Sequence, residues 1–278
     1  MSNKNTAIST NWIVTVTLIL SSLTIIAPMY LTVVTAFKEP SDMVNSVWTL
    51  PTTWHWENIP TAIRMTNFWR AFASSALIAI PTVILTILTN SIIGYVIARN
   101  LDRRLFKGAY LYIMSGMFVP FAVMMLPLVK YMSTLQLNNQ FGLIIIYVVY
   151  NLPLNMLIYT GYVHSIPRDV EESASMDGAG PWRTYWQIIF PLMGPVNVTV
   201  GILTGLAAWN DFLLPLVILT DPKDATLPLV QYVFQSQFTT NYNLAFSSYL
   251  LAILPMIVVY LFFQKKIIGG VMAGSIKS

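Results

Sequence analysis

The stretch AFASSALIAIPTVILTILTNSIIGYVIA (residues 71–98) contains no charged side chain over its whole length. A helix needs about 20 residues to cross the roughly 30 Å hydrocarbon core of a bilayer, so this stretch is long enough to span a membrane. The composition of the chain agrees, because 56% of its 278 residues are hydrophobic and only 9% are charged, whereas soluble domains carry about 25% charged residues. The sequence therefore predicts a protein embedded in a membrane.

Five further apolar stretches are long enough to span a bilayer. They cover approximately residues 12–37, 108–129, 141–163, 188–220 and 243–264. We therefore predict an all-α integral membrane protein with six transmembrane helices, which form a single transmembrane domain over residues 1–278. The first stretch is expected to be retained, because the core of a cleaved signal peptide is only about 7–15 residues long. Pro81, Pro120 and Pro127 fall inside spans, where neighbouring helices can satisfy the carbonyls that proline frees.

Lysine and arginine are distributed unevenly between the two sides of the predicted topology. Twice as many of the 15 basic residues fall on the side of the two termini as on the other side. Basic residues are enriched in cytoplasmic loops, so both termini are predicted to be cytoplasmic. The loop RNLDRRLFK (99–107) contributes most, and we interpret it as a topology determinant. The net charge of +4 then needs no nucleic-acid partner to explain it.

Several kinds of active site are disfavoured by what the chain lacks. It contains no cysteine, which excludes thiolate metal ligands and a cysteine nucleophile. Its two histidines, His55 and His164, lie on opposite sides of the predicted membrane, so no metal site is expected. No G-x-x-x-x-G-K-[ST] phosphate-binding loop occurs in the sequence, so we expect no cofactor on this chain. We predict a non-catalytic protein.

A polar segment, EESASMDGAGPWRTYWQIIFPLMGP (171–195), interrupts the apolar sequence on the predicted cytoplasmic side. Pro167 and Pro181 suit the first turns of two short helices. Asp177-Gly178 marks the end of the first helix, because glycine adopts the left-handed conformation at low cost. The first helix carries small or acidic side chains, and two interpretations stay open: a knob that docks into a protein socket, or a solvated loop with an acidic face.

The second predicted helix of this segment carries one aromatic and apolar face. The residues that form the face are Trp182, Tyr185, Trp186 and Ile189. Their spacing places them on one side of a helix, which suits a position in the membrane interface.

The segment IPRDVEESASMDGAGPWRTYWQIIFPLMGP (166–195) resembles the EAA loop of bacterial ABC importer permeases, specifically of the carbohydrate branch. Glu172, Ser173 and Ala174 occupy the positions of the Glu-Ala-Ala triplet, and Gly178 occupies that of the signature glycine. Serine for the first alanine is a mild departure from the family pattern, as is phenylalanine for a leucine near the end of the loop.

Two further stretches support the resemblance. AAWNDFLLPLVIL (207–219) is similar to the W-N-D-F segment of sugar permeases, and QKKIIGGVMAGSIKS (264–278) is similar to the end of the maltose-type second permease subunit. The resemblance implies the ABC type I importer permease fold in the bacterial cytoplasmic membrane. It also implies a cytoplasmic coupling loop at about 165–187 and a short cytoplasmic tail at about 265–278.

The resemblance further implies a function and a set of partners. Such a permease forms half of the translocation pathway of an ATP-driven, binding-protein-dependent sugar importer, whose substrate we expect to be a di- or oligosaccharide. The expected partners are a second permease subunit in a heterodimer, two copies of a cytoplasmic ATPase subunit that bind ATP and Mg²⁺, an extracytoplasmic sugar-binding protein and the lipid bilayer. The residues implied to couple the chain to the ATPase are Glu171, Glu172, Ser173, Ala174, Asp177, Gly178 and Ala179.

Asn210 and Asp211 are the candidate pathway-lining residues. An acidic side chain inside an apolar span is costly and should face a cavity or a partner. Asp211 could instead bond a neighbouring helix of the partner permease or lie near enough to the outer surface to be hydrated, and these alternatives stay open. An ion-coupled secondary transporter is the alternative function, although such proteins usually carry intramembrane acids or paired repeats.

The longest predicted external loop covers residues 38–70. Pro40, Pro51 and Pro60 are expected to interrupt regular structure there. The loop is expected to contact the partner permease or the binding protein, or else to lie as a lid on the membrane face.

Overall fold

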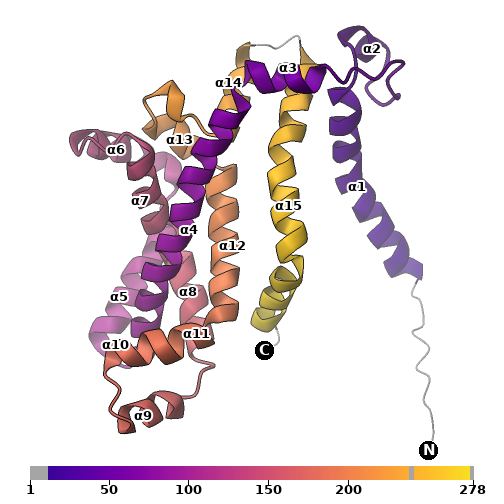
Figure 1. Cartoon of the computed structure of the whole chain (residues 1–278). Helices are drawn as coiled ribbons and strands as arrows, with labels where there is room; N and C mark the ends of the chain where they lie inside the picture. Colours follow the sequence, from indigo (N-terminus) through magenta and orange to yellow (C-terminus); the bar gives the residue numbers. More distant parts are fainter. Residues whose placement is uncertain (1–11, 238–240, 276–278) are drawn as a thin grey trace, which may run out of the picture. The chain divides into compact units, whose positions relative to one another are not determined.

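The structure, a computed structural model, describes residues 12–237 and 241–275. Helices and their connections make up this part of the chain, and none of its residues forms a strand (Figure 1). The predicted all-α fold class is therefore confirmed. The helices belong to two compact units: one holds the described residues of Met1–Thr66 and Phe234–Leu254, the other those of Asn67–Val233 and Pro255–Ser278. The single transmembrane domain over the whole chain stays a prediction.

The first unit contains α1 (Trp12–Ala36), α2 (Pro40–Asn45), α3 (Asn58–Met65) and the first part of α15 (Tyr242–Ser275). Proline begins α2, and Pro60 lies in the first turn of α3. The expectation that these two prolines interrupt regular structure is therefore wrong. The physical reason is that the N–H groups of a first helical turn have no partner within the helix, so a proline removes nothing there.

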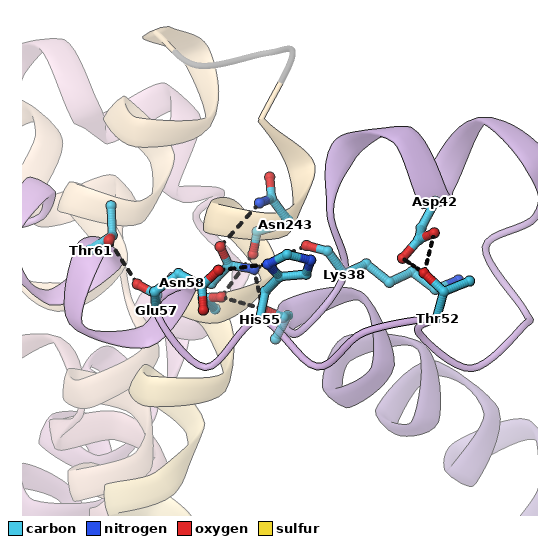
Figure 2. A network of polar contacts seen from close by, with 10 residues as sticks. Lys38, Asp42, Thr52, His55, Glu57, Asn58, Thr61 and Asn243 are labelled. Atoms are coloured by element: carbon cyan, nitrogen blue, oxygen red, sulfur yellow. Dashed lines mark hydrogen bonds and ion pairs between the residues drawn. The ribbon is translucent and has the colours of Figure 1, made fainter.

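Polar side chains connect the end of α1 to α3 and α15 within this unit (Figure 2). The Asn58 amide donates to the carbonyl oxygens of Ala36 and Lys38, both at 3.0 Å. The Asn243 amide donates to Asn58 Oδ1 at 3.3 Å, and the Ser247 hydroxyl donates to Ala36 O at 2.8 Å. All three polar side chains are buried. The bonds therefore satisfy carbonyls at the end of α1 where water does not reach them.

Lys38 lies two residues after the end of α1, and it is fully buried, with 0% of its surface exposed. Its ammonium group donates to the carbonyl oxygens of Ser46 at 2.8 Å and Val47 at 3.3 Å, and to Thr49 Oγ1 at 3.3 Å. A cation taken out of water needs such partners, because burial without them is costly. The side chain therefore fixes the segment after α2 against the end of α1.

The second unit is built around α4 (Phe68–Arg99), a helix of 32 residues. Its other elements in chain order are α5 (Arg104–Ser115), η1 (Gly116–Phe118), α6 (Phe121–Thr134), α7 (Gln140–Tyr150), α8 (Leu152–Val163), α9 (Asp169–Met176), α10 (Pro181–Thr184), η2 (Tyr185–Ile189), α11 (Phe190–Leu192), α12 (Gly194–Asn210), α13 (Leu213–Ile218), η3 (Pro222–Asp224), the start of α14 (Leu227–Gln237) and the part of α15 from Pro255 on. η1 and η3 are 3₁₀ turns, and η2 is a π-helical turn. α7, α8 and α12 pack against α4, which therefore organises this unit.

Glycine allows these helices to approach α4 closely. A Cβ atom added to Gly94 of α4 would lie 2.4 Å from Cβ of Tyr159 on α8. On α12, a Cβ atom added to Gly201 would lie 3.1 Å from Ile87 Cδ1 of α4, and Gly205 faces the same helix. Small residues at such contacts let helix backbones come together, and the resulting packing is a main source of helix association in membranes.

Among the described residues, three helices are each long and apolar enough to span a membrane: α1, α4 and the Tyr242–Phe262 part of α15. The number rises to six if each of three bent helix pairs crosses as one span, judged by length and composition. The bends are 103° between η1 and α6, 45° between α7 and α8, and 75° between α11 and α12. The number of six spans stays a prediction.

Three of the predicted spans do not form one continuous helix. The stretch at 141–163 is divided into α7 and α8, which meet at Asn151 with the bend of 45°. The stretch at 108–129 breaks at Pro120, whose backbone is extended with φ −60° and ψ 134°. Proline has no N–H to continue the ladder of helical bonds, and it disfavours a helical residue before it. The stretch at 188–220 breaks at Asp211, whose ψ of 134° ends α12 at Asn210.

The ends of the chain carry two further predictions. The cytoplasmic tail predicted at about 265–278 begins inside α15, which ends at Ser275, and residues 276–278 lie outside the described residues. Residues 1–11, which include the basic Lys4, also lie outside them. The cytoplasmic location of both termini stays a prediction.

Candidate functional site

α9 forms the first half of the polar segment, and it ends in the turn that the sequence predicts. The helix covers Asp169–Met176, and Gly178 follows with a φ of 79°, in the left-handed region. The Gly178 amide donates to Ser175 O at 3.0 Å, and the Ala179 amide donates to Ala174 O at 2.9 Å. This pair of bonds forms a Schellman motif, which satisfies the last carbonyls of the helix.

The side chains of α9 differ in their exposure, since some are buried within the chain and others face outward. Ala174 is only 5% exposed, whereas Met176 is 90% exposed. The other exposed residues of the helix and its cap include Glu172, Ser173, Ser175 and Asp177. α9 therefore presents a face of small and acidic side chains with one methionine. Ala174, which the resemblance implies to couple the chain to the ATPase, is itself buried within this chain.

Glu171 faces α4 instead. Its Oε1 accepts a hydrogen bond from Arg99 Nε at 2.6 Å, and its Oε2 accepts one from the Tyr95 hydroxyl at 3.0 Å. Arg99 Nη2 donates to Ile166 O at 3.0 Å, and Arg168 Nη2 donates to Arg99 O at 3.1 Å. The Arg99 and Glu171 side chains are only 10% and 20% exposed, so this ion pair is largely removed from water. Both carboxylate oxygens of Glu171 therefore accept hydrogen bonds from residues of this chain.

The second half of the polar segment does not present the single aromatic face that its spacing predicts. Tyr185 and Ile189 are 3% and 0% exposed, whereas Trp182 and Trp186 are 68% and 37% exposed. Tyr185 and Ile189 belong to a buried cluster of this unit, so the interface position predicted for the four residues does not hold for these two. The helix includes the π-helical turn η2.

Both halves of the polar segment contact α4. The Tyr185 hydroxyl lies 2.6 Å from Ser91 Oγ, and its ring centroid lies 5.3 Å from that of Tyr95. α10, which leads into Tyr185, begins at Pro181 as predicted. Pro167 lies two residues before α9, so it does not occupy the first turn expected for it.

Asn210 and Asp211, the predicted pathway residues, lie together at a hollow of about 380 Å³ in the second unit. The hollow is lined by Phe121, Tyr147, Tyr150, Asn151, Ala207, Asn210, Asp211, Leu213 and Leu214. Aromatic and aliphatic side chains make up most of this wall, and the polar groups are two amides, a carboxylate and the tyrosine hydroxyls. Such a wall is typical of sites for small molecules.

Asp211 is held by two donors of its own chain. Its Oδ2 accepts from the Tyr147 hydroxyl at 2.9 Å, and its Oδ1 accepts from the Leu213 amide at 2.9 Å. The second bond satisfies an N–H at the start of α13, where a helix has no internal acceptor. Asn210 donates to Leu206 O at 3.0 Å. The bond from Tyr147 connects Asp211 to α7 of its own chain, whereas the alternative left open by the sequence was a bond to the partner permease, which stays a prediction.

Sequence reasoning missed several of these residues. Arg99 lies in a basic stretch that was interpreted only as a topology determinant, and its partner Glu171 is 72 positions away. Tyr147 belongs to a group of aromatic residues without a distinguishing pattern. Tyr95 lies four residues before Arg99, which places the two on the same helix face. This spacing is the one sequence signal that could have linked Tyr95 to the site.

Relatives of this chain cover nearly its whole length. Residues 90–268 match the family model of the binding-protein-dependent transport system inner membrane component. The multiple sugar-binding transport system permease protein MsmG of Streptococcus mutans is 37% identical over 273 residues, which cover 94% of this chain and 95% of that protein. The diacetylchitobiose uptake system permease protein NgcG of Streptomyces coelicolor is 31% identical over 265 residues, which cover 94% of this chain and 87% of that protein.

A solved structure shares the fold. It is a crystal structure of a bacterial ABC transporter involved in the import of the acidic polysaccharide alginate. The TM-score is 0.78 at 22% identity, and the match covers 91% of this chain and 94% of that chain. This similarity confirms the importer permease fold.

The family match contains both candidate sites, because residues 90–268 include the polar segment and the hollow. It gives no support to the ion-coupled alternative. Relatives of this kind are non-catalytic transport subunits, and together with the apolar helices they identify a multi-pass protein of the bacterial plasma membrane. This chain belongs to the family of binding-protein-dependent transport system inner membrane components, the permease subunits of ABC importers.

Proposed function

We propose that this chain is a permease subunit of an importer for sugars, and that the substrate is a di- or oligosaccharide. The observation that carries the proposal is the combination, in one chain, of an exposed docking helix and relatives named for sugar transport. MsmG and NgcG, named for multiple sugars and for diacetylchitobiose, each align with 94% of the chain. Their substrates support the substrate class proposed here.

α9 is the proposed contact with an ATPase subunit. Glu172 is exposed on α9 together with Ser173 and Ser175, so it can enter a groove and pair with a base there. Such a pair is largely desolvated, and the loss of one partner leaves the other charge unpaired. Ser173, Met176 and Asp177 belong to the same surface, whereas Ala174, Gly178 and Ala179 maintain its shape through burial and the Schellman motif.

The chemistry of ATP belongs to that partner. This chain has no phosphate-binding loop, so ATP and Mg²⁺ are proposed to bind to the ATPase subunit.

The proposed assembly contains two copies of this ATPase, a second and different permease subunit, and an extracytoplasmic sugar-binding protein. α1 buries only Val34, Thr35 and Ala36 of its side chains. Its remaining apolar surface is available for lipid and for the second permease.

The hollow at Asp211 is the proposed part of the translocation pathway. The rings of Phe121 and Tyr150 lie 6.2 Å apart at an angle of 83°, and aromatic faces of this kind can pack against the C–H groups of a sugar. The carboxylate of Asp211 and the amides of Asn151 and Asn210 can bond its hydroxyl groups. The volume of about 380 Å³ is within the range of small-molecule sites, about 300–1,000 Å³.

Co-purification tests the docking contact. The tagged chain is expressed with the products of neighbouring genes, and retention of an ATPase subunit in detergent is measured for the wild type and for Glu172→Arg. We expect the variant to lose the ATPase at equal membrane abundance, because a base would face the base in the groove. Asp102→Arg is the matched control, since Asp102 is an exposed acid on the loop between α4 and α5. If the wild type retrieves no ATPase, the proposed function is refuted.

Transport kinetics test the pathway. Tyr150→Ala and Asn210→Ala are each expected to raise the KM for sugar uptake while the ATPase subunit stays bound. Tyr112→Ala is the control, because Tyr112 is 80% exposed and lies outside the hollow. Unchanged kinetics in both pathway variants would exclude the hollow from the route of the sugar.

A further inference from the structure

A line of three residues on α4 holds both halves of the polar segment. Ser91, Tyr95 and Arg99 follow each other at intervals of four, which places them along one face of the helix. Ser91 contacts the Tyr185 hydroxyl at 2.6 Å, and Tyr95 and Arg99 together bind the two carboxylate oxygens of Glu171. α9 and η2 are thus attached to the same face of the same helix.

The charges at this attachment suit the helix ends that carry them. Arg99 lies in the last turn of α4, and Glu171 lies in the first turn of α9. A helix dipole favours a positive charge at its C-terminal end and a negative charge at its N-terminal end. The pair therefore joins the end of one helix to the start of the other. At 10% and 20% exposure, it is screened less by solvent than a surface ion pair.

α4 connects this attachment to the hollow. The helix has 32 residues, which corresponds to a length of about 48 Å. It packs against α7, which carries Tyr147, and against α12, which ends at Asn210. A displacement of α9 can therefore reach the walls of the hollow through one continuous helix, with α9 at the far end of this unit (Figure 1).

We propose that Glu171 and Arg99 are positioning residues that transmit movement from α9 to α4, and that Glu171 is not a docking charge. The proposal rests on the proposed function, because it assumes that an ATPase subunit moves α9. The proposal assigns different roles to two adjacent acids: Glu172 binds the ATPase, and Glu171 binds α4. Loss of the two should therefore have different consequences.

The test uses the complete transporter in proteoliposomes, with its second permease, ATPase subunits and sugar-binding protein. ATPase retention, ATP hydrolysis and sugar uptake are measured for Glu171→Ala, Arg99→Ala and Glu172→Ala. We expect the first two variants to retain the ATPase at the wild-type level and to take up about threefold to thirtyfold less sugar per ATP hydrolysed, the range expected for a residue that carries coupling. Glu172→Ala is expected to lose the ATPase instead.

Exchanging the two charges tests whether the ion pair between Arg99 and Glu171 is itself responsible for the coupling. Arg99→Glu and Glu171→Arg are expected to uncouple singly, and the double variant is expected to recover part of the uptake per ATP. A general loss of packing would not be reversed in this way. Tyr95→Phe removes only one hydroxyl group, so this variant can still be tested if the alanine variants do not reach the membrane. It is expected to lower sugar uptake per ATP by a smaller factor than the alanine variants do.

Two results would overturn the inference. One is wild-type uptake per ATP in Glu171→Ala and Tyr95→Phe. The other is loss of the ATPase from Glu171→Ala at equal membrane abundance, which would make Glu171 a docking residue. Failure of the proposed function is distinguishable from both, because the wild-type complex would then retain no ATPase or take up no sugar.

Discussion

Replacement of Gly178 by alanine should open the turn that ends α9. Gly178 has a φ of 79°, and a Cβ atom added to it would meet no atom within 4 Å. The added methyl group therefore causes no clash, and the whole cost is that of the left-handed conformation. This cost is roughly 1–2 kcal/mol for a residue other than glycine. It corresponds to a decrease of about fivefold to thirtyfold in the ratio of closed to open turn.

Hydrogen exchange measures this opening directly. The amides of Gly178 and Ala179 donate the two bonds of the turn, so a peptide covering residues 171–185 should exchange faster in the variant. Asparagine tolerates the left-handed region better than alanine, and a β-branched residue tolerates it worst. The expected order of exchange rates is wild type, Gly178→Asn, Gly178→Ala and Gly178→Val, from slowest to fastest. ATPase retention should fall in the same order.

Gly180→Ala is the matched control. Gly180 is two residues away and also has open space around it, but its φ is −71° and its ψ is 165°, which any residue adopts. We expect wild-type exchange and wild-type ATPase retention. The reasoning is refuted if Gly180→Ala behaves like Gly178→Ala, or if Gly178→Asn is worse than Gly178→Ala, because side-chain size would then matter rather than backbone conformation.

Three further predictions concern packing, pH and a buried charge. Gly94→Ala should lower thermal stability in detergent by about 1–3 kcal/mol, because the helix contact there has no room for a methyl group, whereas Gly108→Ala meets no atom within 4 Å and should not. The hydrogen bond that His55 Nδ1 donates to the Glu57 carboxylate raises the pKa of His55 above 6.5 and lowers that of Glu57 below 4.5. The stabilisation from this bond is complete between these values, and it is lost as pH rises through the His55 pKa or falls through that of Glu57. Glu57→Gln should return the His55 pKa towards 6.5 in NMR titrations of labelled histidine. Lys38→Met should speed proteolysis between α1 and α3, because the carbonyls of Ser46 and Val47 lose their donor in part-buried bonds, at no more than about 1–3 kcal/mol each.

Each of these predictions has an outcome that contradicts it. Equal melting of the two glycine variants would show that α8 moves away from α4 without cost. An unchanged His55 titration in Glu57→Gln would show that the 2.6 Å contact does not persist in solution. For Lys38→Met the comparison is with Lys130→Met, an exposed lysine, and equal proteolysis of both variants would refute a role for the buried ammonium.

Some features of this protein follow from short stretches of sequence alone. Hydropathy is a sum over neighbouring residues, so the apolar runs identify α1, α4 and the span of α15 within a few residues of their ends. The end of α9 is equally local, because the left-handed turn needs only the glycine that occupies position 178. The EAA-like pattern was recognisable for the same reason, since all its residues lie in one continuous segment.

Other features depend on residues that are far apart in the chain. The bond between Arg99 and Glu171 crosses 72 positions, and the one between Tyr147 and Asp211 crosses 64. Neither partner carries a local sign of the other, since an arginine at a helix end and an acid in a first turn are common in isolation. The sequence also did not predict that Tyr185 is buried while Trp186 is partly exposed, because this depends on the distant residues that pack against Tyr185.

The amino-acid sequence by itself therefore determined the membrane location, the helical class and the place of the capped turn, because solvation and backbone preference act over a few consecutive residues. The tertiary structure decided which of two adjacent acids faces α4 and which faces outward, and which aromatic residues surround Asp211. These choices depend on how helices pack, and the packing energy is shared among side chains that only the fold brings together.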